Sequence, residues 1–283
     1  MPDYPLNTLD PSEILAFEPA MKIGMLATIT DDGLPHLTMI STLKASSEKG
    51  LVWGQFMEGH SKDYIQKRPG VGWLIMTLDR NVWRGKARFT HTATSGVDYD
   101  FFNNTPLFRY NSYFGVHRVY YMNLVAHSGK KPLPMNSVVV AAIKTLIGRT
   151  VTPSRAKKQV INPWTRDFLN KLDNLKFLAY VDKDGIPVIV PAIQAQAGDP
   201  EHVLFSTGVF QADLEAIPAG ASLAVFSLAL TMEDVLLRGN YEGIRRFAGF
   251  RCGSVKIDWV YNPMPPVPGQ VYPEVKIQEV RNF

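Results

Sequence analysis

The sequence has little cysteine, no long apolar run and no signal peptide, so it lacks the features of disulfide-bonded, membrane-spanning and secreted proteins. Cys252 is the one cysteine among 283 residues, so no disulfide forms within the chain and a reducing, cytoplasmic setting is expected. No apolar run approaches the ~20 residues that span a bilayer. The acidic, proline-rich start MPDYPLNTLDPSE is unlike a signal peptide. We therefore expect a cytoplasmic protein with no membrane partner.

Metal ligands and dense basic patches are also scarce. The six histidines show no metal-ligand spacing such as HExxH, and one cysteine cannot form a zinc cluster, so no metal site is expected. The net charge is +4, but the basic residues are scattered. The densest group is Arg149, Arg155, Lys157 and Lys158. A mildly basic solvated surface explains this distribution, and we expect no nucleic-acid partner.

What the sequence does contain is an internal repeat. The stretch IGMLATITDDGLPHLTMIS (23–41) resembles LKFLAYVDKDGIPVIVPAI (175–193). In both, an alternating apolar strand leads into an acidic turn, Gly-x-Pro and a second strand. Gly33 and Gly185 suit the left-handed position that follows a type I turn. Each stretch therefore predicts a β-hairpin.

The similarity continues along the chain. GLVWG (50–54) matches HVLFS (202–206), a short helix then ends at Pro69 or Pro218, and Arg84-Gly85 matches Arg238-Gly239. An ordered series of this kind favours duplication over chance similarity of two β-rich halves. The pattern predicts a mainly β (α+β) chain of two tandem, six-stranded antiparallel barrels joined by a helical linker. The expected boundaries are 1–130, 131–171 and 172–283, the last with an extended tail.

Residues 93–116 form an aromatic-rich insertion that the second repeat lacks. Its aromatic residues either wall a binding site or act as a packing plug. They are Tyr99, Phe101, Phe102, Phe108, Tyr110, Tyr113 and Phe114. Just after the insertion, His117 and Arg118 are candidates for contact with an anionic substrate.

The segment His60-Ser61-Lys62 stands at the predicted start of a helix that ends at Pro69. Ser61 is a good N-cap residue, and a helix N-terminus offers free N–H groups and partial positive charge. A hydroxyl and a lysine there, with His60 as a further candidate, make a candidate phosphate site, and an ordinary capped helix is the alternative. The second repeat has STGVFQADLEAIP instead, with two acids and no cation. The repeats therefore favour an anion site in the first copy alone.

This series of motifs resembles the FMN-binding split barrels related to pyridoxamine 5′-phosphate oxidase. The first repeat (about 14–128) carries all of them, and the second (about 172–262) is similar to a degenerate copy. The resemblance implies a homodimer with one FMN per chain, although the two barrels of one chain could pair instead.

The resemblance also implies a set of cofactor-binding residues. The FMN phosphate would meet Ser61 and Lys62 beside His60, and the ring would lie along Thr38, Met39, Ile40 and Ser41. Core packing is the alternative role of Met39, Ile40 and Phe56. The remaining candidates are Gln55 and Phe56 after the next strand, Trp83 and Arg84 approaching from the partner barrel, and Arg118.

The expected function is therefore that of an FMN-dependent oxidoreductase of the flavin reductase or oxidase kind. No Ser-His-Asp or Cys-His arrangement can be identified, and a flavin enzyme needs none because the cofactor carries the chemistry. The substrate is an unidentified small molecule, with NADH or NADPH as candidate electron donors. The alternatives are a flavin-binding electron carrier, a structural barrel with an empty groove, and a deazaflavin in place of FMN.

Overall fold

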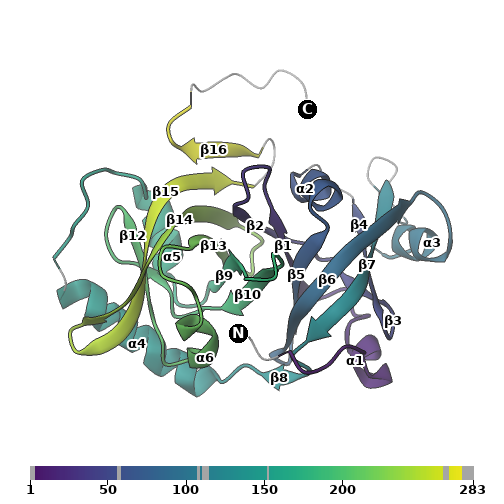
Figure 1. Cartoon of the computed structure of the whole chain (residues 1–283), viewed down its shortest axis with the longest axis horizontal. Coiled ribbons are helices and arrows are strands. Elements are labelled where there is room, and N and C mark those ends of the chain that lie inside the picture. The colour runs from purple at the N-terminus through teal and green to yellow at the C-terminus, as the bar shows by residue number, and fades with distance from the viewer. Residues whose placement is uncertain are drawn as a thin grey trace. The chain divides into compact units, whose positions relative to one another are not determined.

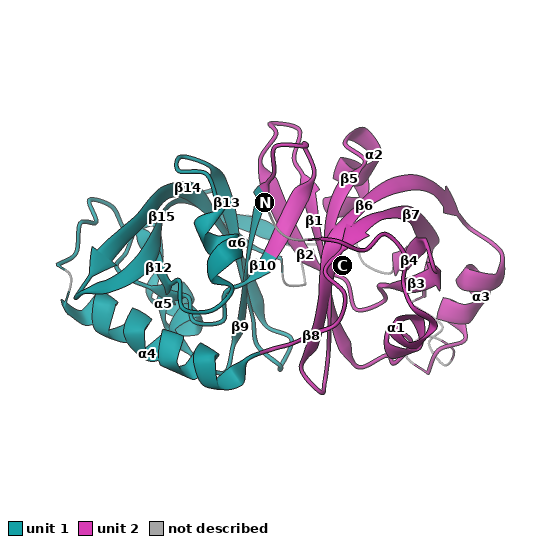
Figure 2. Ribbon diagram, turned by 60° about the horizontal axis from the view of Figure 1, so that its bottom comes forward, with its two compact units in different colours: residues 1–2, 134–180, 190–283 teal, residues 3–133, 181–189 magenta. Residues whose placement is uncertain are grey.

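A computed structural model describes residues 4–55, 59–106, 109, 115–151, 153–263 and 268–275. The chain divides into two compact units (Figure 2). Unit 2 contains residues 3–133 and 181–189, and unit 1 contains residues 1–2, 134–180 and 190–283. Each is described by itself below.

The first barrel is an antiparallel sheet of eight strands in the order β2-β1-β5-β6-β7-β4-β3, with β8 paired to β6 (Figure 1). Its strands are β1 (Lys22–Ile29), β2 (Pro35–Met39), β3 (Lys44–Ser47), β4 (Gly50–Gln55), β5 (Gly70–Thr77), β6 (Asn81–Ala93), β7 (Arg118–His127) and β8 (Lys131–Pro132). Its helices are α1 (Pro11–Ala16), α2 (Ser61–Lys67) and α3 (Val97–Asn103).

The second barrel is also an antiparallel sheet of eight strands, in the order β10-β9-β13-β14-β15-β12-β11, with β16 paired to β15. Its strands are β9 (Leu175–Val181), β10 (Pro187–Pro191), β11 (Gln196–Ala197), β12 (His202–Ser206), β13 (Ser222–Leu228), β14 (Asp234–Phe247), β15 (Phe250–Asn262) and β16 (Gly269–Tyr272). Its helices are α4 (Met135–Val151), α5 (Pro163–Asn170) and α6 (Gln211–Glu215).

The two strand orders are the same when each strand from β1 to β7 is replaced by the corresponding strand from β9 to β15. The prediction of a mainly β chain with two tandem antiparallel barrels is therefore confirmed. Each sheet has eight strands, two more than the six predicted. The two shortest strands, β8 and β11, are only two residues long. Such short pairings carry no alternation that a sequence pattern could reveal.

The hairpin turns match in detail. Gly33 has a φ of 81° and Gly185 a φ of 75°, the left-handed conformation predicted for both. The N–H of Gly33 donates to the carbonyl of Thr30 at 2.9 Å, and that of Gly185 donates to the carbonyl of Asp182 at 2.9 Å. The same turn thus closes both copies.

The repeat also begins earlier than the sequence analysis placed it. Helix α1 follows the N-cap Asp10 and starts with Pro11, and α5 follows the N-cap Asn162 and starts with Pro163. The Oδ1 of Asn162 accepts from the N–H of Thr165 at 2.8 Å, and the Oδ1 of Asp10 accepts from that of Ser12 at 2.9 Å. Both caps satisfy N–H groups of the first helical turn. Helix α5, assigned to the linker from sequence, is thus the counterpart of α1.

The first barrel encloses a core of large aromatic and aliphatic side chains. Trp53 stacks on Tyr120 with ring centroids 4.1 Å apart. Phe17 meets the rings of Trp73 and Trp83 edge-on, at 6.1 Å and 5.2 Å. Aromatic pairs in these geometries add to the stabilisation from apolar burial. This core fixes the strands that carry the candidate site.

The described part of the insertion packs against the barrel. Helix α3 contacts β4 and β7, and Phe102 is buried with Val52, Val116 and Val119. Lys44 lies 3.7 Å from the ring centroid of Phe101 and 3.5 Å from a carboxylate oxygen of Asp98. These contacts favour the packing plug. Phe108, Tyr110, Tyr113 and Phe114 lie outside the described residues.

Segment 181–189 belongs to unit 2 and packs on β5 and β6. The Nζ of Lys86 lies 2.7 Å from carboxylate oxygens of both Asp182 and Asp184. A Cβ at position 72 would lie 2.5 Å from the carbonyl oxygen of Pro187, so this close approach requires Gly72. The hairpin turn is therefore fitted to this surface by both charge and shape.

Candidate functional site

The candidate site begins at α2, which packs against β1 and β2 (Figure 1). The prediction that Ser61 is the N-cap is wrong. His60 occupies that position, with helical φ and ψ and no side-chain capping bond, and Ser61 is the first residue of the helix. The reason is a competing tertiary contact, because the hydroxyl of Ser61 lies 2.7 Å from the hydroxyl of Thr38 on β2.

This hydroxyl pair joins two segments that the sequence analysis had proposed separately. Ser61 is only 4% exposed, and Thr38 is half-buried. In the first turn of α2, the N–H of Asp63 donates to the carbonyl of His60 at 3.0 Å, while helix geometry supplies no intrahelical acceptor for the N–H of Ser61. His60 is exposed and Lys62 is half-buried at the same end of α2. A hydroxyl, helical N–H groups, an imidazole and a lysine side chain thus gather at one place.

A cluster of rings lies beside the hydroxyl pair. His36, two residues before Thr38 on β2, is buried with its ring centroid 5.4 Å from Tyr64 and 6.3 Å from His60. The rings of His60 and Tyr64 stack at 5.9 Å. The sequence analysis did not select His36 or Tyr64. Because side chains alternate along a strand, His36 lies on the same face of β2 as Thr38, and this pattern could have identified His36 from the sequence.

A second polar group lies where β4 ends and β7 begins. Gln55 pairs with Arg118 across these strands, and the hydroxyl of Tyr120 donates to Oε1 of Gln55 at 2.9 Å. Burial raises the pKa of the Tyr120 phenol, Arg118 opposes that shift, and the charge of Asp63 adds to it. The phenol therefore stays protonated and able to donate.

The structure places the other predicted residues as follows. Met39 pairs with Met25 across β1 and β2 and is half-buried. Ile40 packs against the core, and its N–H donates to the carbonyl of Gly24 at 2.7 Å. Ser41 is half-buried after β2. Phe56 lies outside the described residues.

Trp83 and Arg84 do not join this group. The Nε1 of Trp83 donates to Oε1 of Glu13 at 2.9 Å, inside the core of the first barrel. The Nη1 of Arg84 donates to the carbonyl oxygen of Ile189 at 3.3 Å. Consecutive residues of a strand face opposite sides of the sheet, so these two side chains diverge. Within one chain they contact the core and segment 181–189, and their approach from a partner barrel stays a prediction.

The second barrel has no equivalent of the hydroxyl pair. By the repeat spacing, Val190 stands where the first barrel has Thr38. Helix α6 starts at Gln211 after the N-cap Phe210, whose φ of 51° is left-handed, so Phe210 and Gln211 stand where α2 has His60 and Ser61. Helix α6 also buries Asp213. The start of α6 therefore carries no lysine or histidine, and a buried carboxylate there would not attract an anion.

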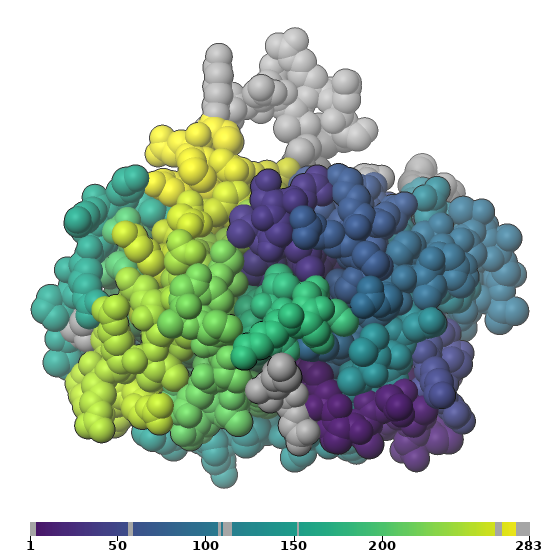
Figure 3. All heavy atoms as spheres, viewed as in Figure 1, coloured from purple at the N-terminus to yellow at the C-terminus, as the bar shows by residue number. Residues whose placement is uncertain are grey.

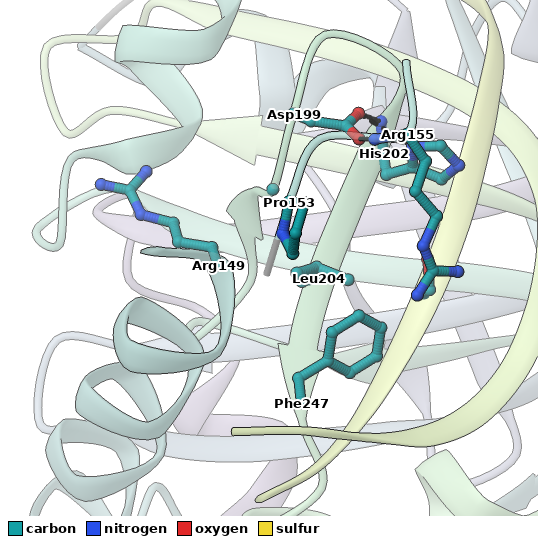
Figure 4. A pocket seen from close by; sticks show the side chains of 9 residues that line it. Arg149, Pro153, Arg155, Asp199, His202, Leu204 and Phe247 are labelled. Atoms are coloured by element: carbon teal, nitrogen blue, oxygen red, sulfur yellow. Dashed lines mark hydrogen bonds and ion pairs between the residues drawn. The ribbon is translucent and has the colours of Figure 1, made fainter. Parts of the chain in front are cut away.

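Unit 1 contains a small hollow made of other residues (Figure 4). His202 donates or accepts through Nδ1 at 2.8 Å from Oδ1 of Asp199, and Arg149, Arg155 and Phe247 also line the hollow. Burial disfavours the charged form of Asp199, but the N–H groups of Glu201 and Arg155 and the His202 ring hold its pKa below the usual range. The space, about 20 Å³, suits roughly one water and no cofactor.

Within the described ranges, no three His, Cys, Asp or Glu side chains lie together as metal ligands would. The chemistry available at the α2 site is therefore that of hydroxyl, amide, imidazole, ammonium and guanidinium donors. Such a set binds anions and orients polar ring edges.

No family model and no curated protein matches this sequence. Solved structures do resemble it. An FMN-binding protein from Syntrophomonas wolfei is 13% identical over 43% of this chain and 83% of its own, with a TM-score of 0.35. A putative pyridoxamine 5′-phosphate oxidase from Lactobacillus delbrueckii is 15% identical over 44% of this chain and 97% of its own (TM-score 0.34). An F420 reductase is 15% identical over 42% of this chain and 98% of its own (TM-score 0.35). Each of these matches covers less than half of this chain and most of the solved structure's own chain.

Proposed function

We propose that this chain is an FMN-binding flavoprotein that acts as an oxidoreductase on a small molecule. The observation that carries the proposal is the Ser61–Thr38 hydroxyl pair at the start of α2, with His60 and Lys62 beside it. The corresponding positions of the second barrel are Val190 for Thr38, Phe210 for His60 and Gln211 for Ser61. One barrel is therefore equipped for a phosphate ester and the other is not.

The residues fit the charge of a flavin phosphate. Ser61 and Thr38 share one hydroxyl–hydroxyl bond, which leaves a hydroxyl hydrogen available to an external acceptor. Lys62 supplies positive charge at the end of α2 where the helix dipole is also positive. Hydrogen bonds from charged donors to phosphate oxygens are about twice as strong as neutral ones.

The second polar group suits the ring of the cofactor. Tyr120 donates to Oε1 of Gln55, which orients the amide so that its NH₂ group points away from the phenol. A fixed amide can recognise the carbonyl and N–H edge of a flavin ring, and Arg118 adds a positive charge next to it. Bound FMN supplies hydride or single-electron transfer, and these residues bind and orient it.

The proposal is tested by titrating the purified protein with FMN and following flavin fluorescence. The double variant Ser61→Ala with Lys62→Ala should bind FMN more weakly by about 2–4 kcal/mol, because two charge-assisted or buried hydrogen bonds are lost. A matched control is Gln66→Ala with Lys67→Ala, which changes the opposite, exposed end of α2. Equal affinity of the two double variants would refute the assigned phosphate site.

A second assay separates an enzyme from an electron carrier. Steady oxidation of NADH or NADPH in the presence of FMN and an acceptor supports the enzyme, and reduction of the flavin without turnover supports the carrier. A protein that binds no flavin at all would be the structural barrel with an empty groove. Competition with a deazaflavin shows which of the two cofactors the site prefers.

A further inference from the structure

Helix α4 presents a broad apolar face to solvent. It is the longest helix of unit 1 and runs along the lower edge of the view in Figure 1, where its teal atoms reach the surface in Figure 3. Val139, Val140 and Ile143 are 54%, 50% and 50% exposed, and Val151 at the end of the helix is 64% exposed. Leu146 and Ile147 complete the row. Single exposed apolar side chains are ordinary, but a contiguous row of six indicates a binding surface.

The helix cannot turn this face inward, because its other side is already fixed to the second barrel. Val138, Ala141, Ala142, Thr145 and Gly148 are buried. The Oγ1 of Thr145 accepts from the N–H of Ser206 at 2.9 Å, and the hydroxyl of Ser206 donates to the carbonyl of Ala141 at 2.9 Å. A helix that is apolar on both sides normally has both sides covered. Its outer side therefore needs a partner.

The charge around α4 identifies the kind of partner. Within unit 1, residues 134–166 contain six lysines and arginines and no aspartate or glutamate. Arg155, Lys157 and Lys158, which follow the helix, are exposed. The nearby Asp199 side chain is only 9% exposed and Glu201 is buried, and their carboxylates accept from the N–H groups of Arg155 and Lys157. The exposed charged side chains of this segment are therefore basic, and they are attracted to an anionic surface.

We propose that α4 and the basic segment 153–158 bind the surface of a bilayer that contains anionic lipid. An exposed apolar helix face with flanking lysine and arginine is the combination that lies at a membrane interface. A nucleic acid would be attracted by the charge but offers nothing to cover the row of Val, Ile and Leu. Trp164 on α5 is 49% exposed, and tryptophan is enriched at membrane interfaces.

The helix would lie on the membrane and not cross it. At 17 residues, α4 is about 25 Å long, and no described helix has the length and apolarity to span a bilayer. This proposal does not depend on the flavin function. It revises the expectation of no membrane partner, because the sequence pattern cannot show that the outer face of α4 stays uncovered.

The test is flotation of the full chain with vesicles of phosphatidylcholine alone or mixed with phosphatidylglycerol. Wild type should float with the mixed vesicles, and added salt should weaken the binding. Ile143→Asp with Ile147→Asp should reduce binding to mixed vesicles by roughly tenfold or more. Leu230→Asp with Met232→Asp is the matched control, since both side chains are exposed in the turn between β13 and β14.

A second pair of substitutions avoids the helix altogether. Lys157→Glu with Lys158→Glu changes only exposed side chains and should also weaken binding by about tenfold or more. The proposal is overturned if wild type does not float with mixed vesicles, or if both double variants float as wild type does. It is also overturned if light scattering shows that α4 substitutions dissociate a dimer while vesicle binding persists, because α4 would then be covered by a second copy.

Discussion

At the residue scale, the candidate site shows how tertiary contacts override local preference. Serine before a helix favours the N-cap position, yet Ser61 directs its hydroxyl to Thr38, which is 23 residues earlier in the chain. The sequence analysis selected both residues, but only the structure joins them. It missed Tyr120 and His36, whose partners depend on which strands lie side by side.

The first prediction concerns the Ser61–Thr38 pair. Thr38→Val and Ser61→Ala should each lower the free energy of unfolding by about 1–2 kcal/mol, since each leaves the other hydroxyl buried without its partner. The double variant should be less destabilised than the sum of the single variants, with a coupling of about 1 kcal/mol. Urea denaturation of all four proteins measures this, and strictly additive losses would contradict a direct bond.

The second prediction concerns Asp234 at the start of β14. Burial raises the pKa of its carboxyl from 3.8 to about 7, and its Oδ1 accepts no hydrogen bond among the described residues. Between pH ~4 and ~7 the folded state keeps a proton that the unfolded state has released, so the free energy of unfolding falls as pH rises through this window.

Asp234→Asn should therefore raise the free energy of unfolding by about 2 kcal/mol at pH 8 and change it little at pH 4. Thermal unfolding at the two pH values measures the difference. Asp167→Asn, at an exposed position of α5, is the control and should show no such dependence. Equal gains for Asp234→Asn at both pH values would rule out titration as the cause.

At the scale of elements, the two hairpin turns show what burial does to an ion pair. Lys67 and Asp31 lie 2.7 Å apart with each side chain 59% exposed, whereas Lys86 and Asp182 lie 2.7 Å apart with side chains 9% and 8% exposed. The distances are equal, but only the second pair is removed from water. Burial disfavours the charged form of Asp182, and the Lys86 hydrogen bond is the strongest influence that lowers its pKa.

The third prediction compares these pairs. Lys86→Ala should lower the free energy of unfolding by about 3 kcal/mol, because it leaves Asp182 buried without a cation. Lys67→Ala should cost about 0–1 kcal/mol, as exposed pairs do. The contribution of Asp182 should be present above pH ~4 and disappear as pH falls through its lowered pKa. Similar losses for the two variants in urea denaturation would show that burial of segment 181–189 is incomplete.

At the scale of the whole molecule, duplication has produced two barrels that have the same strand order but different side chains at the start of the short helices α2 and α6. The cationic, hydroxyl-bearing start of α2 has become an apolar start followed by a buried acid in α6. The second barrel carries α4 and the first carries α3, and among the described residues neither helix has a counterpart in the other barrel. We infer that the copies have divided their roles.

The fourth prediction follows from that division and rests on the proposed flavin function. The protein saturated with FMN should hold one flavin per chain and not two, because only one barrel offers a phosphate site. Absorbance of the dialysed holoprotein at the flavin and protein bands gives the ratio. A ratio of two would contradict the asymmetry. Light scattering of the same sample tests the predicted homodimer.

The sequence by itself determined the duplication, the antiparallel strands, the hairpin glycines at 33 and 185 and the position of α2. These features are local, since strand alternation and turn chemistry act between residues a few positions apart. Only the tertiary structure decided that Trp83 bonds Glu13 in the core, that Ser61 meets Thr38, and that α4 keeps an apolar face in solvent. Those outcomes depend on which segments far apart in the sequence come into contact. Such contacts form only when the strands pair in their final register.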